Sequence, residues 1–336
     1  SDWEVGEATE AERRDLARRE VELFGRGHAL NPEWLLDQNP AGKALVLVAR
    51  TPEGRIAGTR SLLPWRVISG GTEIRVGHSI RLWTEPEFRR QGVAIAIGRE
   101  LERRSREMGY PVVYLFPSDR LLPRYRRQEN RFEFALERRQ LLISLRFFGS
   151  GVPAVFDWPL SWTRGWRSRA RNDHRWSLAE NAAELAGGLW EQIQTPEGVV
   201  GVRDASFVAW RFSAESGHAY LMLRYPARGP VRLLAAVHSA PENRSRILDV
   251  WGIGDADEKV LAVAGLVERL ADQGTILIDW CLPEHGSDAR IAARAGFLRR
   301  RRGVPMGVWM NQAAQELGDL ADPRCYRLNE GDSDYA

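Results

Sequence analysis

The chain has 336 residues, which is longer than the roughly 100–200 residues of an average domain, so two domains are expected. Its hydrophobic fraction of 43% is sufficient for sizeable buried cores. No apolar run reaches the roughly 18 residues of a membrane span, and the N-terminus shows no signal-peptide core. We therefore expect a cytoplasmic protein with no membrane partner. The net charge of +3 does not require a polyanionic partner.

Cysteine and lysine are both rare. Cys281 and Cys325 form no CxxC motif, so they indicate neither a zinc site nor a disulfide framework, and we expect no metal cofactor. Lys43 and Lys259 are the only lysines among 48 basic residues, so the positive charge is almost entirely arginine. Arginine clusters matter for function, because the planar guanidinium suits phosphate better than an ammonium group does.

The first half of the chain predicts three antiparallel strands followed by a helix and a further, buried strand. The helix ends at Gly109, which is the expected C-terminal stop signal. The predicted strands cover 43–50, 56–68 and 73–83, the helix covers 93–108, and the last strand covers 111–116.

The second half repeats this order and adds a short helix and a final strand, which indicates a weak internal repeat. Trp83 and Trp251 end corresponding strands, but the second half lacks the loop sequence "EPEFRRQG". The predicted strands cover 219–224, 231–239, 246–253, 275–282 and 303–311, and the predicted helices cover 257–273 and 287–297.

The two halves are joined by a segment rich in Pro, Gly, Trp and Arg, residues 148–176, which predicts a connector. Helices are predicted over 178–194 and 204–215. We expect an α/β (α+β) protein in which each half is a mixed, mostly antiparallel sheet flanked by helices. The predicted domains are 1–147, a connector with helices over 148–215, and 216–336.

The loop before the first long helix has the composition of a phosphate site. A helix N-terminus attracts anions through its unpaired N–H groups and its dipole. The loop lacks the G-x-x-x-x-G-K-[ST] and G-x-G-x-x-G patterns of nucleotide sites. Small residues would instead let the backbone wrap a pyrophosphate, to which the two arginines add charge-assisted contacts. The predicted binding residues are Arg89, Arg90, Gln91, Gly92, Val93 and Ala94; an arginine-rich helix cap with no ligand is the alternative.

Arg89, Gly92 and Ala94 fit the pattern [RQ]-x-x-G-x-[GA] after a strand, and this resembles the signature of the GNAT superfamily of N-acyltransferases. The resemblance covers about 43–135 and, less closely, 216–311. It implies an acyltransferase whose loop holds the pyrophosphate of acetyl-CoA or another acyl-CoA. It also implies a tandem arrangement in which the second half is a degenerate copy.

The strand before the loop resembles the fourth strand of that superfamily, which splays away from the fifth. The resemblance implies that Leu82, Trp83 and Thr84 pair with the pantetheine arm. It also suggests Tyr125 as the acid that protonates the departing thiolate, with packing on a helix as the alternative. The chain departs from the family pattern at Arg131-Phe132, which stands where Gly-Phe is usual.

Acyl transfer to an amine needs a base and an oxyanion donor. His78 shares a strand face with Ile80 and Leu82 and is one candidate base; a core histidine is the alternative. Glu85 follows the strand and is the second candidate; a solvated loop acid is the alternative.

Three classes of function remain. The first is transfer from acyl-CoA to an amine of a small molecule. In the second, the donor is an aminoacyl-tRNA, and the arginine and tryptophan residues of 148–176 contact the RNA. The third is a non-catalytic acyl-CoA sensor. The identity of the acceptor, the length of the acyl chain and the choice between monomer and homodimer stay open.

Overall fold

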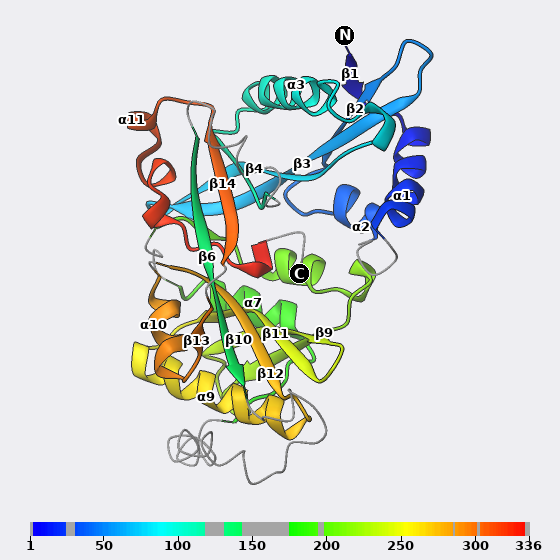
Figure 1. The fold of residues 1–336 in the computed structure, drawn as a ribbon. Coiled ribbons are helices and arrows are strands. Elements are labelled where there is room, and N and C mark those ends of the chain that lie inside the picture. The colour runs from blue at the N-terminus through cyan, green and yellow to red at the C-terminus, as the bar shows by residue number, and fades with distance from the viewer. Residues whose placement is uncertain are drawn as a thin grey trace.

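The computed structural model describes residues 3–24, 31–117, 131–142, 175–193, 198–284, 286–300 and 303–332. These residues form one 14-stranded, mostly antiparallel sheet with helices on its faces (Figure 1). The main path through the sheet is β1-β2-β3-β4-β5-β14-β6-β12-β11-β10-β9-β7. The predicted fold class, a mixed and mostly antiparallel sheet flanked by helices, is confirmed.

The first half contains the predicted elements, with ends shifted by a few residues. An antiparallel meander leads through α3 to β5, which runs parallel to β4. Before the meander come one edge strand and two helices. The bounds are β1 Glu4–Glu7, α1 Glu10–Phe24, α2 Pro32–Asp37, β2 Leu45–Arg50, β3 Ile56–Ser69, β4 Thr72–Thr84, α3 Val93–Glu107 and β5 Val112–Leu115.

The second half has the same connectivity, since its meander leads through α9 to the parallel strand β12. The predicted helices and strands are again present. The bounds are α7 Ala182–Trp190, α8 Ala205–Arg211, β9 Tyr220–Tyr225, β10 Leu233–Ala240, β11 Arg244–Gly252, α9 Ala256–Asp272, β12 Leu277–Pro283, α10 Ser287–Arg294 and β14 Val304–Met310. The short strands are β7 Ser177–Leu178, β8 Val200–Gly201 and β13 Leu298–Arg299.

The halves exchange strands. β14, which comes from the end of the chain, lies between β5 and β6, with Val308 opposite Tyr114 on one side and Phe132 on the other. β6 (Arg131–Leu142) then pairs with β12, with Gln140 opposite Asp279. Figure 1 shows β6 running from the first half into the second. The sheet is therefore continuous, and each half is completed by a strand from the other.

Helix α3 covers one face of the first half. Val93, Ile97 and Leu101 recur every four residues and are buried against Leu62 and Val113 of the sheet. This spacing places them on a single helix face, which explains why the segment folds as an amphipathic helix. The opposite face of the sheet is covered by α1 and α2 and belongs to the core that joins the two halves.

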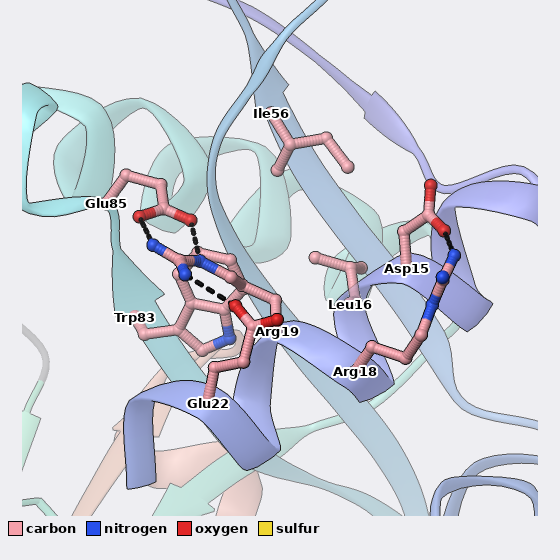
Figure 2. A pocket seen from close by; sticks show the side chains of 8 residues that line it. All are labelled: Asp15, Leu16, Arg18, Arg19, Glu22, Ile56, Trp83 and Glu85. Atoms are coloured by element: carbon pink, nitrogen blue, oxygen red, sulfur yellow. Dashed lines mark hydrogen bonds and ion pairs between the residues drawn. The ribbon is translucent and has the colours of Figure 1, made fainter.

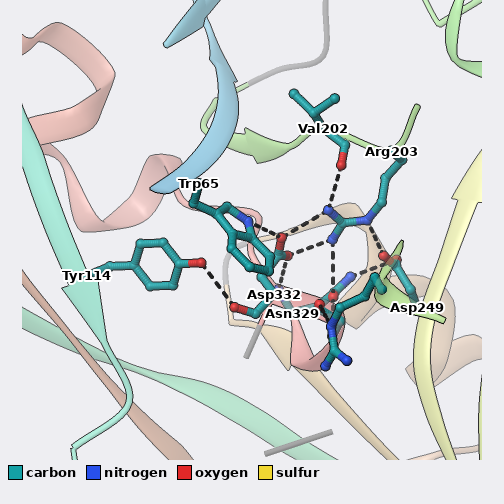
Figure 3. A network of polar contacts seen from close by, with 9 residues as sticks. Trp65, Tyr114, Val202, Arg203, Asp249, Asn329 and Asp332 are labelled. Carbon is teal, nitrogen blue, oxygen red and sulfur yellow. Dashed lines mark hydrogen bonds and ion pairs between the residues drawn. The ribbon is translucent and has the colours of Figure 1, made fainter. Parts of the chain in front are cut away.

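The C-terminal segment ends between the halves in a buried polar network (Figure 3). Arg203 forms ion pairs with Asp249 of β11 and with Asp332, and all three side chains are buried. Trp65 Nε1 donates to Asp332 Oδ1 (3.2 Å), and Tyr114 Oη donates to the Asp332 carbonyl oxygen (3.0 Å). Buried charges are tolerated when they are paired in this way. The network therefore fixes the end of the chain to both halves.

We predict that neither half folds alone. A fragment of residues 1–147 contains β6 without β12 and β5 without β14, so it exposes strand edges that the intact chain covers. By circular dichroism and size-exclusion chromatography, fragments 1–147 and 148–336 should each lack a cooperative thermal transition. Co-expressed, the two fragments should elute together and unfold cooperatively. A monomeric 1–147 fragment that unfolds cooperatively would show that the first half does not need β12 and β14 of the second half to fold.

Candidate functional site

The strands β4 and β5 diverge in the middle of the first half. Their pairing consists of Gly77 opposite Val113 and His78 opposite Tyr114. β4 continues to Thr84 beyond this point, whereas β5 ends at Leu115. The backbone groups of β4 beyond His78 therefore lie outside the β4–β5 ladder, where an extended ligand could pair with them.

A bulge in β4 accompanies the divergence. Thr59 of β3 lies opposite Trp83, whereas Ser61 lies opposite Ile80, so β4 holds one residue more than its partner. Arg81 sits in the bulge with a left-handed backbone (φ 55°), which non-glycine residues rarely adopt. Bulges of this kind redirect a strand and are over-represented next to active sites.

Beyond β4 the chain forms the predicted loop and enters α3. Arg90 (φ 65°) and Gly92 (φ 89°) are both left-handed, and Gly92 is the N-cap of the helix. Arg89 Nε donates to the Thr84 carbonyl oxygen (3.2 Å), which ties the loop to the end of β4. The Ile95 N–H donates to the Gly92 carbonyl oxygen at 2.9 Å, so Val93 and Ala94 carry the N–H groups that the start of a helix leaves without an intrahelical acceptor. Val93 is buried, whereas Ala94 is half-buried at the start of α3.

The N-termini of α3 and α9 differ in charge. The cap of α3 is glycine, no side chain bonds to its first turn, and that turn contains no acidic residue. In α9 the Asp255 carboxylate accepts hydrogen bonds from the N–H groups of Asp257 and Glu258. Asp257 and Glu258 are ion-paired with Arg294 and Arg232, so the Asp255 carboxylate is the group that occupies the place where an anion would bind. An anion therefore fits the start of α3 and is repelled from the start of α9.

A cavity of about 410 Å³ opens on the other face of β4, between the strand and α1 (Figure 2). Charged groups line it together with an apolar wall. The lining residues are Asp15, Leu16, Arg18, Arg19, Glu22, Ile56, Trp83 and Glu85. Of the predicted site residues, Trp83 and Glu85 meet here, and both lie at the end of β4.

Two ion pairs hold α1 to the end of β4: α1 supplies the arginine in one and the glutamate in the other. Arg19 of α1 donates to both carboxylate oxygens of Glu85, with Nε 2.6 Å and Nη2 2.7 Å away. Glu20 of α1 in turn accepts from Arg81 Nε at 3.0 Å. The hydrogen bonds from Arg19 hold the pKa of Glu85 below its usual range, so this carboxylate is ionised at neutral pH.

His78 lies away from the cavity. It is 1% exposed and stacks on the Tyr114 ring with centroids 4.3 Å apart, while Trp65 and Phe116 meet it edge-on. Burial, assisted by the charge of Arg211, lowers the pKa of His78 to about 3. The imidazole is therefore neutral at pH 7 and part of an aromatic cluster.

Some predicted residues lie outside the described residues. These are Tyr125 and the tryptophans of the connector up to residue 174. Conversely, the sequence analysis did not single out Arg19 or Glu20, whose partners are 66 and 61 positions away. Charged residues on a mixed helix carry no sign of such distant pairing. Asp249, which sits among apolar residues of β11, forms its ion pair with Arg203, a residue that the sequence analysis did not single out either.

Residues 7–129 match the model of the acetyltransferase (GNAT) domain family. The chain is similar to a probable N-acyltransferase from Enterococcus faecalis, with TM-score 0.63, 13% identity, and 91% of this chain and 72% of that chain covered. A GCN5-related N-acetyltransferase from Anabaena variabilis gives TM-score 0.63, 12% identity, and 94% and 74% coverage. The N-myristoyltransferase of Saccharomyces cerevisiae, solved with bound myristoyl-CoA, gives TM-score 0.57, 9% identity, and 93% and 84% coverage. No curated protein sequence matches the chain.

The diverging strands and the glycine-capped helix define a GNAT-type domain in the first half. The family match assigns residues 7–129 to the GNAT acetyltransferase domain family, and the described residues share the fold of the solved N-acyltransferases. The resemblance inferred from the loop is confirmed. Across the described ranges, no helix is both long and apolar enough to cross a bilayer. Within the same ranges, no group of three or more His, Cys, Asp or Glu side chains could hold a metal ion.

We predict that His78 makes folding stability depend on pH. The folded state keeps the imidazole neutral down to about pH 3, whereas the unfolded state protonates it below about 6.5. Its stabilising contribution is thus complete above pH 6.5 and is lost as pH falls towards 3. In urea unfolding at pH 7, 6, 5 and 4, His78→Phe should reduce the slope of stability against pH by up to about 1.4 kcal/mol per pH unit. An unchanged slope would show that His78 is protonated in the folded protein.

Proposed function

We propose that this chain is an acyl-CoA-dependent N-acyltransferase, most simply an N-acetyltransferase, that acts on an amine of a small molecule. The observation that carries the proposal is the contrast between α3 and α9. α3 begins at Gly92 with no acid in its first turn and follows Arg89 and Arg90, whereas Asp255 occupies the start of α9. Of these two helix N-termini, only that of α3 suits a pyrophosphate. α3 also follows β4, the strand that diverges from β5.

In the proposed complex the loop residues from Arg89 to Ala94 hold the pyrophosphate of coenzyme A. Its pantetheine arm lies in the gap between β4 and β5 and pairs with the backbone of Leu82, Trp83 and Thr84. The amine nitrogen attacks the thioester carbonyl, the C–S bond breaks, and coenzyme A leaves as a thiolate that takes up a proton. A backbone N–H at the end of β4 is the proposed oxyanion donor.

The candidate groups for proton transfer are His78, Glu85 and Tyr125. We favour Glu85 as the group that meets the acceptor, because it lines the cavity beside Trp83. His78 lies in the aromatic cluster, where burial keeps it neutral. Tyr125 remains the proposed acid for the departing thiolate.

We propose further that the chain is a tandem protein with domain limits 1–147, 148–215 and 216–336. The second half supports this because β11 and β12 also diverge: their pairing stops at Ile247, opposite Trp280. The C-terminal residues Asn329–Asp332 lie against both strands there. The second half would thus complete the sheet packing instead of binding a donor.

The proposal favours acyl-CoA over the two alternatives. An intact loop at α3 supports coenzyme A as the donor in preference to an aminoacyl-tRNA. A cavity that reaches Trp83 supports transfer in preference to sensing, because a sensor needs no acceptor site. One protein of similar fold holds myristoyl-CoA, so the donor panel should include long acyl chains.

We predict that acetyl-CoA binds the intact chain and that Gly92→Glu weakens this binding at least tenfold, about 1.4 kcal/mol. The substitution places bulk and negative charge in a left-handed position (φ 89°) that faces the pyrophosphate. Isothermal titration with acetyl-CoA, myristoyl-CoA and free coenzyme A measures the effect.

The matched control is Met108→Glu, which adds the same charge at an exposed position at the opposite end of α3. It should leave the affinity within twofold of the parent chain. If no coenzyme A species binds the parent chain, the donor assignment is wrong and the aminoacyl-tRNA alternative gains weight. Equal binding by both variants would place the pyrophosphate elsewhere.

A further inference from the structure

The cavity beside Trp83 has an excess of negative charge. Three carboxylates line it and two guanidinium groups oppose them, which leaves a net charge of −1. The carboxylates belong to Asp15, Glu22 and Glu85, and the guanidinium groups to Arg18 and Arg19. A ligand that enters with a single positive charge would neutralise this lining.

Arg19 is shared between two of the carboxylates. Its Nε and Nη2 bind Glu85, while its Nη1 lies 2.7 Å from Glu22 Oε2. If Arg19 releases Glu85, its guanidinium therefore keeps an acidic partner. The Arg19 side chain is 39% exposed, whereas that of Glu85 is 14% exposed. The arginine can thus move towards solvent at small cost, and the glutamate stays at the cavity wall.

We propose that the acceptor is a cationic amine without a carboxylate, and that its ammonium group takes the place of Arg19 on Glu85. In this arrangement Arg19 pairs with Glu85 when no acceptor is bound, and Glu85 binds the ammonium group of the acceptor when it enters. The inference rests on the proposed function, because it assumes that an acyl group reaches the end of β4.

The remaining wall of the cavity fits the rest of such an acceptor. Leu16, Ile56 and Trp83 supply apolar and aromatic surface next to the charged groups. An indole ring also attracts cations through its face. A carboxylate on the acceptor would add a negative charge to a lining whose net charge is already −1, so amino acids are disfavoured relative to the matching amines.

The location suits acyl transfer. Trp83 and Glu85 are adjacent to Thr84, at the end of the strand whose backbone would pair with the pantetheine arm. The donor occupies the gap between the strands, and the acceptor approaches from the α1 face. The ammonium group held by Glu85 passes one proton to this carboxylate and then attacks as the neutral amine.

The experiment measures initial rates with acetyl-CoA and two matched acceptors, 2-phenylethylamine and phenylalanine, which differ by one carboxylate. The parent chain should acylate the amine with kcat/KM at least tenfold higher than the amino acid. Glu85→Gln should raise KM for the amine at least tenfold with KM for acetyl-CoA unchanged. Glu85→Asp, which keeps the charge, should recover part of that loss.

Arg19→Gln gives the sharper result, because it removes the group that the ammonium displaces. KM for 2-phenylethylamine should fall at least threefold, whereas the control Arg14→Gln, on an exposed position of the same helix, should change it less than twofold. A rise in KM in Arg19→Gln, or equal use of the amine and the amino acid, would overturn the inference. If acetyl-CoA does not bind at all, the proposed function fails instead, so the two failures are distinct.

Discussion

The divergence of β4 from β5 after His78 is the constraint on which the rest of the site depends. It leaves the backbone groups of β4 beyond His78 outside the β4–β5 ladder. The bulge at Arg81 directs this end of the strand towards both the loop before α3 and the cavity under α1. A donor and an acceptor can therefore approach one strand end from opposite sides, which is the geometry that acyl transfer requires.

The two halves of the molecule have the same connectivity, but they differ at the start of the helix that follows the meander. In the first half the helix that follows β4 begins at Gly92 and has no acidic residue in its first turn. In the second half Asp255 caps the corresponding helix, and residues Asn329–Asp332 lie against the diverging strands. The exchange of β6 and β14 joins both halves into one sheet, and the Arg203 network anchors the chain end between them. This rigid frame holds the walls of the first-half site in place.

Local patterns predicted the meander, α3 and β5 of the first half, the main elements of the second half and the glycine-bearing loop, because each depends on periodicity or on a few adjacent residues. The elements β1, α1, α2 and β6 were not predicted. The exchange of strands could not be predicted, since β6 and β14 would fit any free sheet edge. Alternation put His78 on a strand face, but it did not tell the buried face from an accessible one. The Arg19–Glu85 pair was equally hidden, because a charged residue on a mixed helix does not reveal a partner 66 positions away.

Hydrogen exchange of the backbone amides, with and without acetyl-CoA, tests the central claim most directly. The account predicts that the donor slows exchange at Leu82–Thr84, where the pantetheine arm pairs, and at Gln91–Ala94, where the pyrophosphate binds. It predicts no change at the corresponding residues of the second half, Leu248–Gly252. Protection confined to the second half, or the absence of protection at the start of α3, would contradict the assignment of the donor site to the first half.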